Sequence, residues 1–274
     1  MTLSVLISVY ASEKALYLDR ALCSVWTDQT LKPTEIVLIE DGPLGSELLS
    51  IIEKWKCLLN DRLVIIINEQ NSGLTKSLNR GLKYIKSDLI ARMDSDDISE
   101  PLRFEKQVSY MNNHPEIDVL GGAVKVFNDF NNTSSVHFYP LTPALCRESI
   151  FMATPVSHPA VMMRRKIFDI GIRYNEKYRT SQDIALWFEL LVRGYTFSNL
   201  SDVILSFRKN DNVYLRRKSF SNILNEFKIY MYGIYSLKGI FTWKYIYPML
   251  RLFFRLLPIG LQKKVYTFRL QRLR

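Results

Sequence analysis

The stretch LIARMDSDD, from Leu89 to Asp97, joins an apolar run to three carboxylates. The apolar run has the length and composition of a buried β-strand, so the carboxylates follow the carboxyl end of that strand. Asp94 and Asp96 stand two residues apart there, and carboxylate oxygens so placed can bind a hard divalent cation. A cation held by only one or two protein carboxylates keeps open positions for substrate phosphates, which is typical of Mg²⁺ or Mn²⁺.

Two other interpretations compete for these carboxylates. A calcium loop of the EF-hand type would also use Glu105, but it needs a glycine where Ser99 stands, and Pro101 falls inside the loop. The segment before the loop would have to be a helix, whereas its pattern is that of a strand, so we exclude the calcium loop. An acidic helix N-terminus stabilised by the helix macrodipole remains the open alternative.

Strand and helix patterns alternate from residue 3 up to this stretch. Four β-rich runs are separated by segments of helical periodicity: Leu3–Tyr10, Ile36–Ile39, Leu63–Ile67 and Leu89–Met93. This alternation predicts an α/β fold with a mostly parallel central sheet flanked by helices. Polar residues follow every one of these runs, at the edge where such sheets bind ligands. The first run is not followed by Gly-x-Gly-x-x-Gly, and the chain has no P-loop motif, which disfavours a dinucleotide-binding domain and a P-loop ATPase.

The second half of the chain is less regular. Strands are expected at Val119–Phe127, Ala160–Met163 and Val203–Arg208, and helices at Pro143–Met152 and Asp183–Arg193. We expect one domain over residues 1–210, followed by a helical, basic and aromatic tail over 211–274.

Composition places the chain among ordinary globular proteins, with 47% apolar and 23% charged residues in 274. Its three cysteines show no Cys-x-x-Cys spacing, which disfavours a disulfide framework or a cysteine-based zinc site. The opening residues Met1–Ser4 lead into the first strand without the pattern of a secretory signal, so we expect a cytoplasmic protein.

The net charge of +10 resides entirely in the tail. Acidic and basic residues balance up to Glu226, and the remainder has ten Lys or Arg and no Asp or Glu. Its aromatic and leucine content favours an anionic membrane surface over nucleic acid as the partner. The longest apolar stretch, Tyr245–Ile259, is interrupted by Arg251 and Arg255, so we expect an amphipathic helix that lies on a membrane with these cations near the headgroups. A helix packed on the domain is the alternative.

Taken together, these motifs resemble those of the family 2 glycosyltransferases, which have the GT-A fold. The resemblance extends from residue 3 to about 208 and lies closest to the bacterial branch that builds O-antigen, capsule and exopolysaccharide. Its motifs are Val5–Tyr10, Glu40-Asp41-Gly42, Asn71–Leu74 with Asn79, Ala91–Asp97, Pro101-x-Arg103, Gly121-Gly122, Ser157-His158-Pro159 and Gln182-Asp183-x-x-Leu186-Trp187.

The resemblance implies a role for several residues. Asp41 matches the carboxylate that reads the nucleotide base, and Ser8, Tyr10 and Asn71 match positions beside the nucleotide-sugar. Asp94 and Asp96 match the DxD motif. Asp96 is the expected direct metal ligand, and Asp94 is expected to lie nearer the ribose. Asp183 matches the catalytic base, and one base without a second nucleophilic carboxylate predicts inversion at the anomeric carbon. A helix N-cap is the structural alternative for Asp183, and the two roles are compatible.

Three further residues are candidates for contacts with the diphosphate or the acceptor: His158, Arg92 and Arg164. A lone histidine is often a hydrogen-bonding group of the core, and exposed arginines such as Arg164 often contact no ligand. For Arg92, a buried cation and a phosphate-side cation both remain open.

We therefore expect a metal-dependent glycosyltransferase on the cytoplasmic face of a bacterial inner membrane. Its donor would be a nucleotide-diphosphate sugar, most commonly a UDP-sugar in this family, and its acceptor a lipid-linked saccharide. A nucleotidyltransferase is the first alternative, although Ala11–Lys14 is not the Gly-rich loop that it needs. A non-enzymatic protein that binds a membrane surface or nucleic acid is the second.

Overall fold

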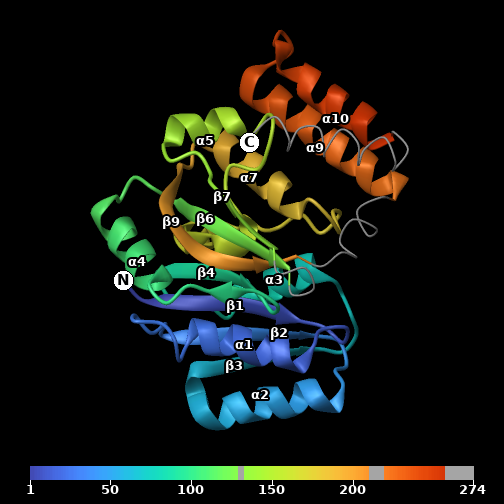
Figure 1. Ribbon diagram of the computed structural model, residues 1–274. Coiled ribbons are helices and arrows are strands. Elements are labelled where there is room, and N and C mark those ends of the chain that lie inside the picture. Colours follow the sequence, from blue (N-terminus) through green and yellow to red (C-terminus); the bar gives the residue numbers. More distant parts are fainter. Residues whose placement is uncertain (129–132, 210–218, 257–274) are drawn as a thin grey trace.

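A computed structural model describes residues 1–128, 133–209 and 219–256. Its centre is a nine-stranded sheet in which the strands run in the order β3-β2-β1-β4-β8-β6-β9-β5, with β7 paired to β6 (Figure 1). The strands are β1 Leu3–Val9, β2 Glu35–Asp41, β3 Leu63–Asn68, β4 Leu89–Asp94, β5 Ile98–Ser99, β6 Val119–Asn128, β7 Thr133–His137, β8 Met162–Arg164 and β9 Phe197–Arg208.

The four strands predicted from the first half of the chain are confirmed as one parallel block. β1 pairs in parallel with β2 and β4, and β2 pairs in parallel with β3. Both faces of this block are covered, and β1 is buried along nearly its whole length. That burial explains why these strands appear in the sequence as continuous apolar runs rather than as alternating patterns.

The helices form a layer on each face of the sheet. Helices α1 (Ala15–Val25), α2 (Ser46–Leu59) and α4 (Arg103–Asn113) pack on the face that includes Val5 and Ile7. Helices α3 (Leu74–Leu82), α5 (Pro143–Ser149), α6 (Lys166–Asp169) and α7 (Gln182–Val192) contribute to the core on the opposite face with Leu6 and Ile39. Successive residues of β1 thus point to opposite cores, as the pleat of a strand requires.

The second half of the sheet differs from the expectation in several bounds. β9 starts at Phe197, six residues before the predicted start, because it pairs in parallel with β6 through register shifts near Gly122 and Ala123. The segment expected as a strand from Ala160 begins with a 3-10 turn, η2 (His158–Ala160), and only then enters β8. The short strands β5 and β7 and the helix α4 add to the predicted elements.

The first described helix of the tail is α9 (Phe220–Lys238), which packs on α7 and shares its core. Ile229, Tyr230 and Ile234 of α9 are buried in the same cluster as Phe188 of α7. The contact is so close that a Cβ atom on Gly233 would lie 2.3 Å from the ring of Phe188. Residues 220–238 therefore belong to the body of the molecule.

A turn of 3-10 helix, η3 (Trp243–Tyr245), leads into α10 (Ile246–Leu256), which lies beside α9 (Figure 1). Arg251 and Arg255 form ion pairs with Glu226 of α9, so the expectation that these two cations face lipid headgroups is wrong. None of the described helices is both long and apolar enough to cross a bilayer. The rest of the predicted amphipathic stretch, from Leu257 on, lies outside the described residues.

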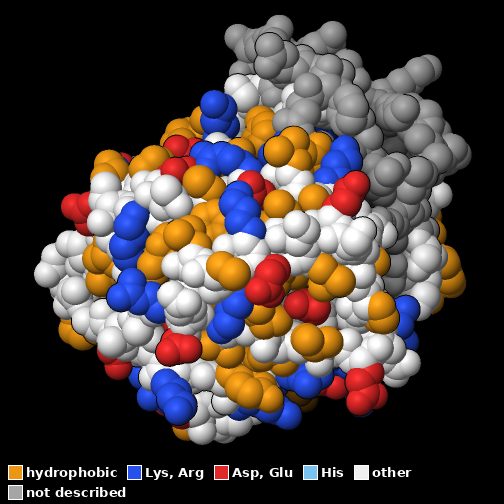
Figure 2. Space-filling view, turned by 90° about the horizontal axis from the view of Figure 1, so that it is seen from below, with side chains coloured by type: hydrophobic (Ala, Val, Ile, Leu, Met, Phe, Trp, Pro, Cys, Tyr) orange, Lys and Arg blue, Asp and Glu red, His pale blue; other side chains and the backbone are white. Residues whose placement is uncertain are grey.

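Figure 2 views the molecule from the α2 end, where acidic and basic side chains are interspersed among hydrophobic ones.

Candidate active site

The carboxyl ends of β1, β2 and β4 bring most of the predicted site residues to one edge of the sheet. Ser8 of β1 is in register with Asp94 of β4, and Val9 is in register with Glu40 of β2. Asp41 ends β2 one residue further on, and Tyr10 follows β1. The register of three parallel strands thus places Ser8, Asp41 and Asp94 at the same edge, as the sequence predicted.

The carboxylate of Asp41 organises the loop after β3. Its Oδ1 accepts hydrogen bonds from Asn68 Nδ2 at 3.0 Å and from the backbone N–H of Ser72 at 2.8 Å, and its Oδ2 accepts from the N–H of Gly73 at 2.9 Å. The side chain of Asn71 donates to the backbone oxygen of Asp41 at 3.2 Å. A carboxylate has about four lone-pair sites, so Asp41 retains acceptor capacity for a ligand beside this loop.

Gly42 allows this loop to approach the end of β2. Its φ is +90°, and a Cβ atom there would lie 2.6 Å from the backbone nitrogen of Asn71. A side chain would therefore be strained by the backbone conformation and would clash with the loop that Asp41 holds.

Asn68 and Arg80 extend this hydrogen-bonded group, although the sequence did not single them out. Asn68 Nδ2 also donates to Ser77 Oγ at 2.9 Å, and Arg80 donates to Asn68 Oδ1 at 2.7 Å. The position of Asn68 at the end of β3 was the available signal, because polar residues follow every strand of the parallel block.

Asp94, Asp96 and Asp97 form an acidic cluster after β4. Each offers a carboxylate oxygen, and these oxygens all lie within 4.8 Å of one another. Burial, followed by the charges of Asp94 and Glu13, raises the pKa of Asp96 to about 7. Burial and the same cluster raise the pKa of Asp97 well above its usual value.

These carboxylates fit a divalent cation. Asp97 is fully buried, its Oδ1 accepts from the backbone N–H of Arg208 at 2.8 Å, and its Oδ2 has no hydrogen-bond partner among the described residues. An unsatisfied buried carboxylate oxygen beside two further carboxylates is costly unless a positive charge compensates it. Asp97 belongs to the Ala91–Asp97 motif, but the resemblance implied no role for it.

Arg92 is the cation nearest to Asp94. Its guanidinium donates to both carboxylate oxygens, with Nη1 at 2.8 Å from Oδ2 and Nη2 bonded to Oδ1. Arg92 is only 2% exposed, so it is a buried partner of Asp94 and not a surface cation. The sequence left a buried and a phosphate-side cation open as alternatives for Arg92, and its burial beside Asp94 favours the buried cation.

His158 lies in the core beside the site and not on its surface. Its Nε2 is 2.8 Å from the hydroxyl of Tyr174, and its ring packs edge-on against Trp187 with ring centroids 5.9 Å apart. Burial, assisted by the charge of Arg92, lowers its pKa well below 6.5, so the ring is neutral. These contacts favour the structural alternative over a contact with the diphosphate.

Asp183 stands in the first turn of α7, where the helix macrodipole stabilises a negative charge. The helix begins at Gln182 with Ser181 as its N-cap residue, so Asp183 is not the cap. Its charge raises the pKa of Tyr174, as does the charge of Asp94, although burial is the main cause. Tyr174 thus lies within electrostatic reach of both the acidic cluster and Asp183.

Arg164 is not brought to this edge. It is in register with Leu89, the first residue of β4, whereas Asp94 is the last. Its guanidinium donates to the backbone oxygens of Met111, His114 and Ile117 at 2.7 to 3.1 Å. The expectation that Arg164 contacts a diphosphate is therefore wrong, because antiparallel β8 carries it to the opposite end of the sheet.

Two residues that sequence reasoning missed adjoin the acidic cluster. Glu13 accepts a hydrogen bond from Ser95 Oγ at 2.7 Å. Arg208, at the end of β9, donates from Nε to the backbone oxygen of Asp96 at 2.8 Å, and its guanidinium lies 3.9 Å from the ring centroid of Tyr17. Only the pairing of β9 in the folded sheet reveals Arg208, because it is more than 100 residues away from the cluster in the sequence.

The edge therefore combines an acidic cluster suited to a cation with a loop held by the Asp41 carboxylate, at the place where α/β sheets bind their ligands. The sequence matches the glycosyl transferase family 2 model over residues 4–171. The chain belongs to this family, which confirms the predicted family and favours it over the nucleotidyltransferase alternative.

The curated relatives are glycosyltransferases, and some of them are named for bacterial polysaccharide biosynthesis. The amylovoran biosynthesis glycosyltransferase AmsE of Erwinia amylovora is 34% identical over 96% of this chain and 97% of its own length. A UDP-Gal:alpha-D-GlcNAc-diphosphoundecaprenol beta-1,3-galactosyltransferase of Escherichia coli is 31% identical over 96% of this chain and 94% of its own. The chain thus belongs with the bacterial polysaccharide-building members, as expected.

Solved structures confirm the fold. S. aureus TarS 1-349 in complex with UDP has a TM-score of 0.69 at 19% identity, covering 96% of this chain and 78% of that one. The complex of the same protein with UDP-GlcNAc has a TM-score of 0.68 at 19% identity, covering 93% and 72%. The mostly parallel sheet flanked by helices is the GT-A fold that the motifs predicted.

Proposed function

We propose that this glycosyltransferase moves a sugar from a nucleotide-diphosphate donor, a UDP-sugar, to a hydroxyl of a lipid-linked glycan, with inversion at the anomeric carbon. The observation that carries the proposal is the convergence at one sheet edge of the Asp41 loop and the acidic cluster. Asp183 and Asp94 both lie within electrostatic reach of Tyr174, which supports a place for Asp183 near this edge. The product would serve the synthesis of O-antigen, capsule or exopolysaccharide, in keeping with the relatives.

The donor's nucleoside would lie between the end of β1 and the Asp41 loop. Ser8 and Tyr10 come from β1 and the residue after it, and Asn71 is bonded to the backbone of Asp41. Asp41 has acceptor capacity for an N–H of the base, while Asn68 and two backbone N–H groups hold its orientation. The UDP complexes of the similarly folded TarS support a uridine donor.

Asp94, Asp96 and Asp97 would hold Mg²⁺ or Mn²⁺, with Asp96 as the main ligand. Such an ion offsets the charge that grows on the departing diphosphate. Arg92 would keep the Asp94 carboxylate in one orientation, because its two hydrogen bonds engage both oxygens. Asp94 would thereby be fixed near the donor ribose.

Asp183 would act as the catalytic base. The acceptor oxygen forms the new bond to the anomeric carbon, its proton passes to the Asp183 carboxylate, and the bond from that carbon to the diphosphate oxygen breaks with its electron pair on the diphosphate. A single displacement of this kind inverts the configuration. Asp183 is suited to the role because a helix start is a rigid mount for a carboxylate.

The relatives and the tail support the proposed acceptor and location. The name of the E. coli relative specifies a saccharide on diphosphoundecaprenol. The basic excess after Glu226 suits an anionic lipid surface. We therefore place the protein peripherally on the cytoplasmic face of the inner membrane, and we assign it no nucleic-acid partner.

Replacing Asp183 tests the mechanism. With UDP-sugars and an undecaprenyl-diphosphate-linked saccharide as acceptor, Asp183→Asn should lower kcat by about 10²- to 10⁴-fold while the affinity for UDP stays unchanged. Glu189→Gln, on the same helix, is the matched control and should retain wild-type kcat. NMR of the product should show the anomeric configuration opposite to that of the donor; retention, or a fully active Asp183→Asn, would refute the proposed base.

A further inference from the structure

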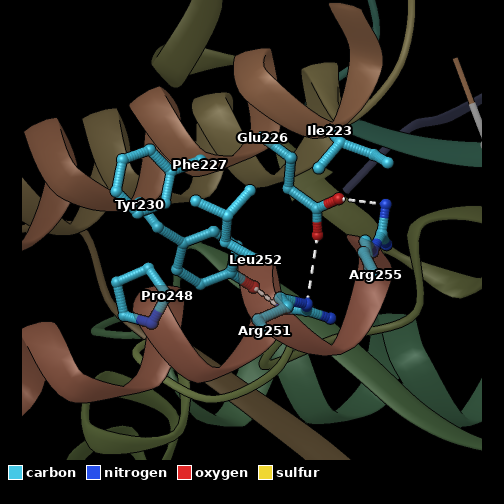
Figure 3. A pocket seen from close by; sticks show the side chains of 8 residues that line it. All are labelled: Ile223, Glu226, Phe227, Tyr230, Pro248, Arg251, Leu252 and Arg255. Carbon is cyan, nitrogen blue, oxygen red and sulfur yellow. Dashed lines mark hydrogen bonds and ion pairs between the residues drawn. The ribbon is translucent and has the colours of Figure 1, made fainter. Parts of the chain in front are cut away.

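Helix α10 turns its cationic side toward the protein. Arg251 Nε lies 3.2 Å from Glu226 Oε1, and Arg255 Nη1 lies 2.6 Å from Oε2 of the same carboxylate. Arg251 also donates to the hydroxyl of Tyr230 at 2.7 Å. Figure 3 shows these side chains converging between α9 and α10. Because Glu226 is only 6% exposed, its buried charge fixes which side of α10 faces α9.

The other side of α10 is apolar and faces solvent. Its residues recur at the three- and four-residue spacing of one helix face, and three more precede them in the connection from α9. We call these residues the α10 face: Ile240, Phe241, Trp243, Ile246, Met249, Leu250, Phe253 and Leu256, all of which are at least 51% exposed. A helix of a soluble domain normally turns such a stripe to the core, and a contiguous exposed apolar surface marks a site of interaction.

The charge of the chain identifies the occupant of this surface. No acidic residue follows Glu226, and residues 257–274 add five Lys or Arg directly after α10. Exposed aromatic side chains such as Phe241 and Trp243, next to an apolar helix face and a basic segment, suit the boundary between lipid headgroups and acyl chains. A surface that is both anionic and apolar beneath its charged layer is a phospholipid bilayer.

We propose that the α10 face inserts into the surface of an anionic phospholipid membrane, while Arg251 and Arg255 stay paired with Glu226 away from the lipid. The ion pairs hold the cationic side of α10 against α9 and leave its apolar side as the docking surface. The basic residues of 257–274 then add an electrostatic attraction that salt screens, whereas the insertion of the apolar face is not screened.

This docking also orients the site. Helix α9 packs on α7, where the ring centroids of Tyr230 and Phe188 lie 5.5 Å apart in an edge-to-face contact. Asp183 lies in the first turn of α7. The α10 face is thus joined through two packed helices to the element that carries the proposed base. This last step rests on the proposed function, but the docking itself does not.

Sedimentation of the full chain with vesicles tests the proposal. The wild type should bind vesicles of phosphatidylcholine mixed with phosphatidylglycerol at low salt, and it should retain measurable binding in about 1 M NaCl, where the Debye length is about 3 Å. Leu250→Ser with Phe253→Ser should weaken binding at both salt concentrations on the order of 100-fold, because two inserted apolar side chains are lost.

Two control variants make the result specific. Leu58→Ser with Ile170→Ser removes two apolar side chains of similar exposure, 59% and 63%, from elsewhere on the surface and should leave vesicle binding within about 2-fold. Phe241→Ser, at a side chain that is 99% exposed, cannot disturb the fold through packing and should weaken binding at high salt. An unchanged UDP affinity of each variant shows that the site is intact.

Three results would overturn the proposal. The first is vesicle binding by Leu250→Ser/Phe253→Ser and Phe241→Ser that equals the wild type. The second is binding that disappears completely in high salt, which would leave only the basic segment in contact with lipid. The third is a wild-type dimer in sedimentation equilibrium that the same substitutions dissociate, because a second copy would then cover the face. A wild type that binds vesicles as described but does not bind UDP, in contrast, would contradict the proposed function and leave the docking intact.

Discussion

At the residue scale, Asp41 shows how one carboxylate can hold the loop beside the proposed nucleotide site. Both of its oxygens accept hydrogen bonds, two of them from backbone N–H groups of Ser72 and Gly73. Asp41→Asn replaces one acceptor by an NH₂ group that faces N–H donors, so we expect a loss of about 1–3 kcal/mol in the free energy of unfolding. Urea denaturation measures this loss.

The same substitution should also weaken the affinity for UDP, by more than the loss of stability alone explains. Glu35→Gln, at the opposite end of β2, is the control and should leave UDP affinity unchanged. Wild-type stability and wild-type UDP affinity in Asp41→Asn would show that the carboxylate neither holds the loop nor reads the base.

His158 predicts a pH dependence of stability. Its folded-state pKa is depressed below 6.5 by burial and by Arg92, so the unfolded chain binds a proton that the folded chain does not. The stability that the neutral ring contributes is therefore complete above pH 6.5 and is lost as the pH falls, by up to about 1.4 kcal/mol per pH unit.

Comparing the wild type with a variant separates the contribution of His158 to the pH dependence of stability from those of Asp96 and Asp97. The raised pKa values of these two carboxyl groups change stability with pH in the opposite direction. Urea denaturation at several pH values between about 7.5 and 5 should show the wild type losing more stability than His158→Asn. Parallel curves for the two proteins would mean that His158 titrates normally in the folded state.

At the element scale, the contact between α7 and α9 decides whether the tail belongs to the domain. A Cβ on Gly233 would lie 2.3 Å from the buried ring of Phe188, so Gly233→Ala should destabilise the protein by about 1–3 kcal/mol despite the better helix propensity of alanine. Thermal or urea denaturation provides the measurement.

Gly45→Ala is the matched control, because the added Cβ would have no atom within 4 Å. It should change stability by less than about 1 kcal/mol. If Gly233→Ala proved as stable as wild type, α9 would not be packed against α7 in solution in the way described.

The orientation of α10 also belongs to this scale. Amphipathic periodicity in the sequence identifies two sides of this helix, but not which side faces the protein. The partner that decides it, Glu226, lies on another helix 25 residues before Arg251. The expectation of headgroup-facing arginines failed for this reason, since burial of a distant carboxylate is a tertiary effect.

At the scale of the whole molecule, the sequence predicted the parallel half of the sheet and the acidic edge well. Each strand there is a continuous apolar run followed by polar residues, so local pattern and final position agree. Asp41, Asp94 and Asp96 were found at this edge for the same reason.

The mixed half of the sheet, from β8 to β5, was less predictable, because its register depends on long-range pairing. Arg164 was assigned to the site although β8 runs antiparallel to β4 and carries it to the other end. Arg208 and Glu13 reach the acidic cluster from distant segments, and the buried pairing of Arg92 with Asp94 appears only once β4 is enclosed. Contacts across a sheet edge are not encoded in the spacing of residues along one segment.

The central claim, a metal-assisted nucleotide-sugar site at the acidic edge, is tested most directly by calorimetric titration with UDP, GDP and dTDP, each with and without Mn²⁺. We predict that one nucleotide, UDP, binds in a metal-dependent manner. Asp96→Ala should abolish this dependence, whereas Glu105→Ala, at an exposed carboxylate of α4, should preserve it. Failure of all three nucleotides to bind, or metal-dependent binding that survives Asp96→Ala, would contradict the account.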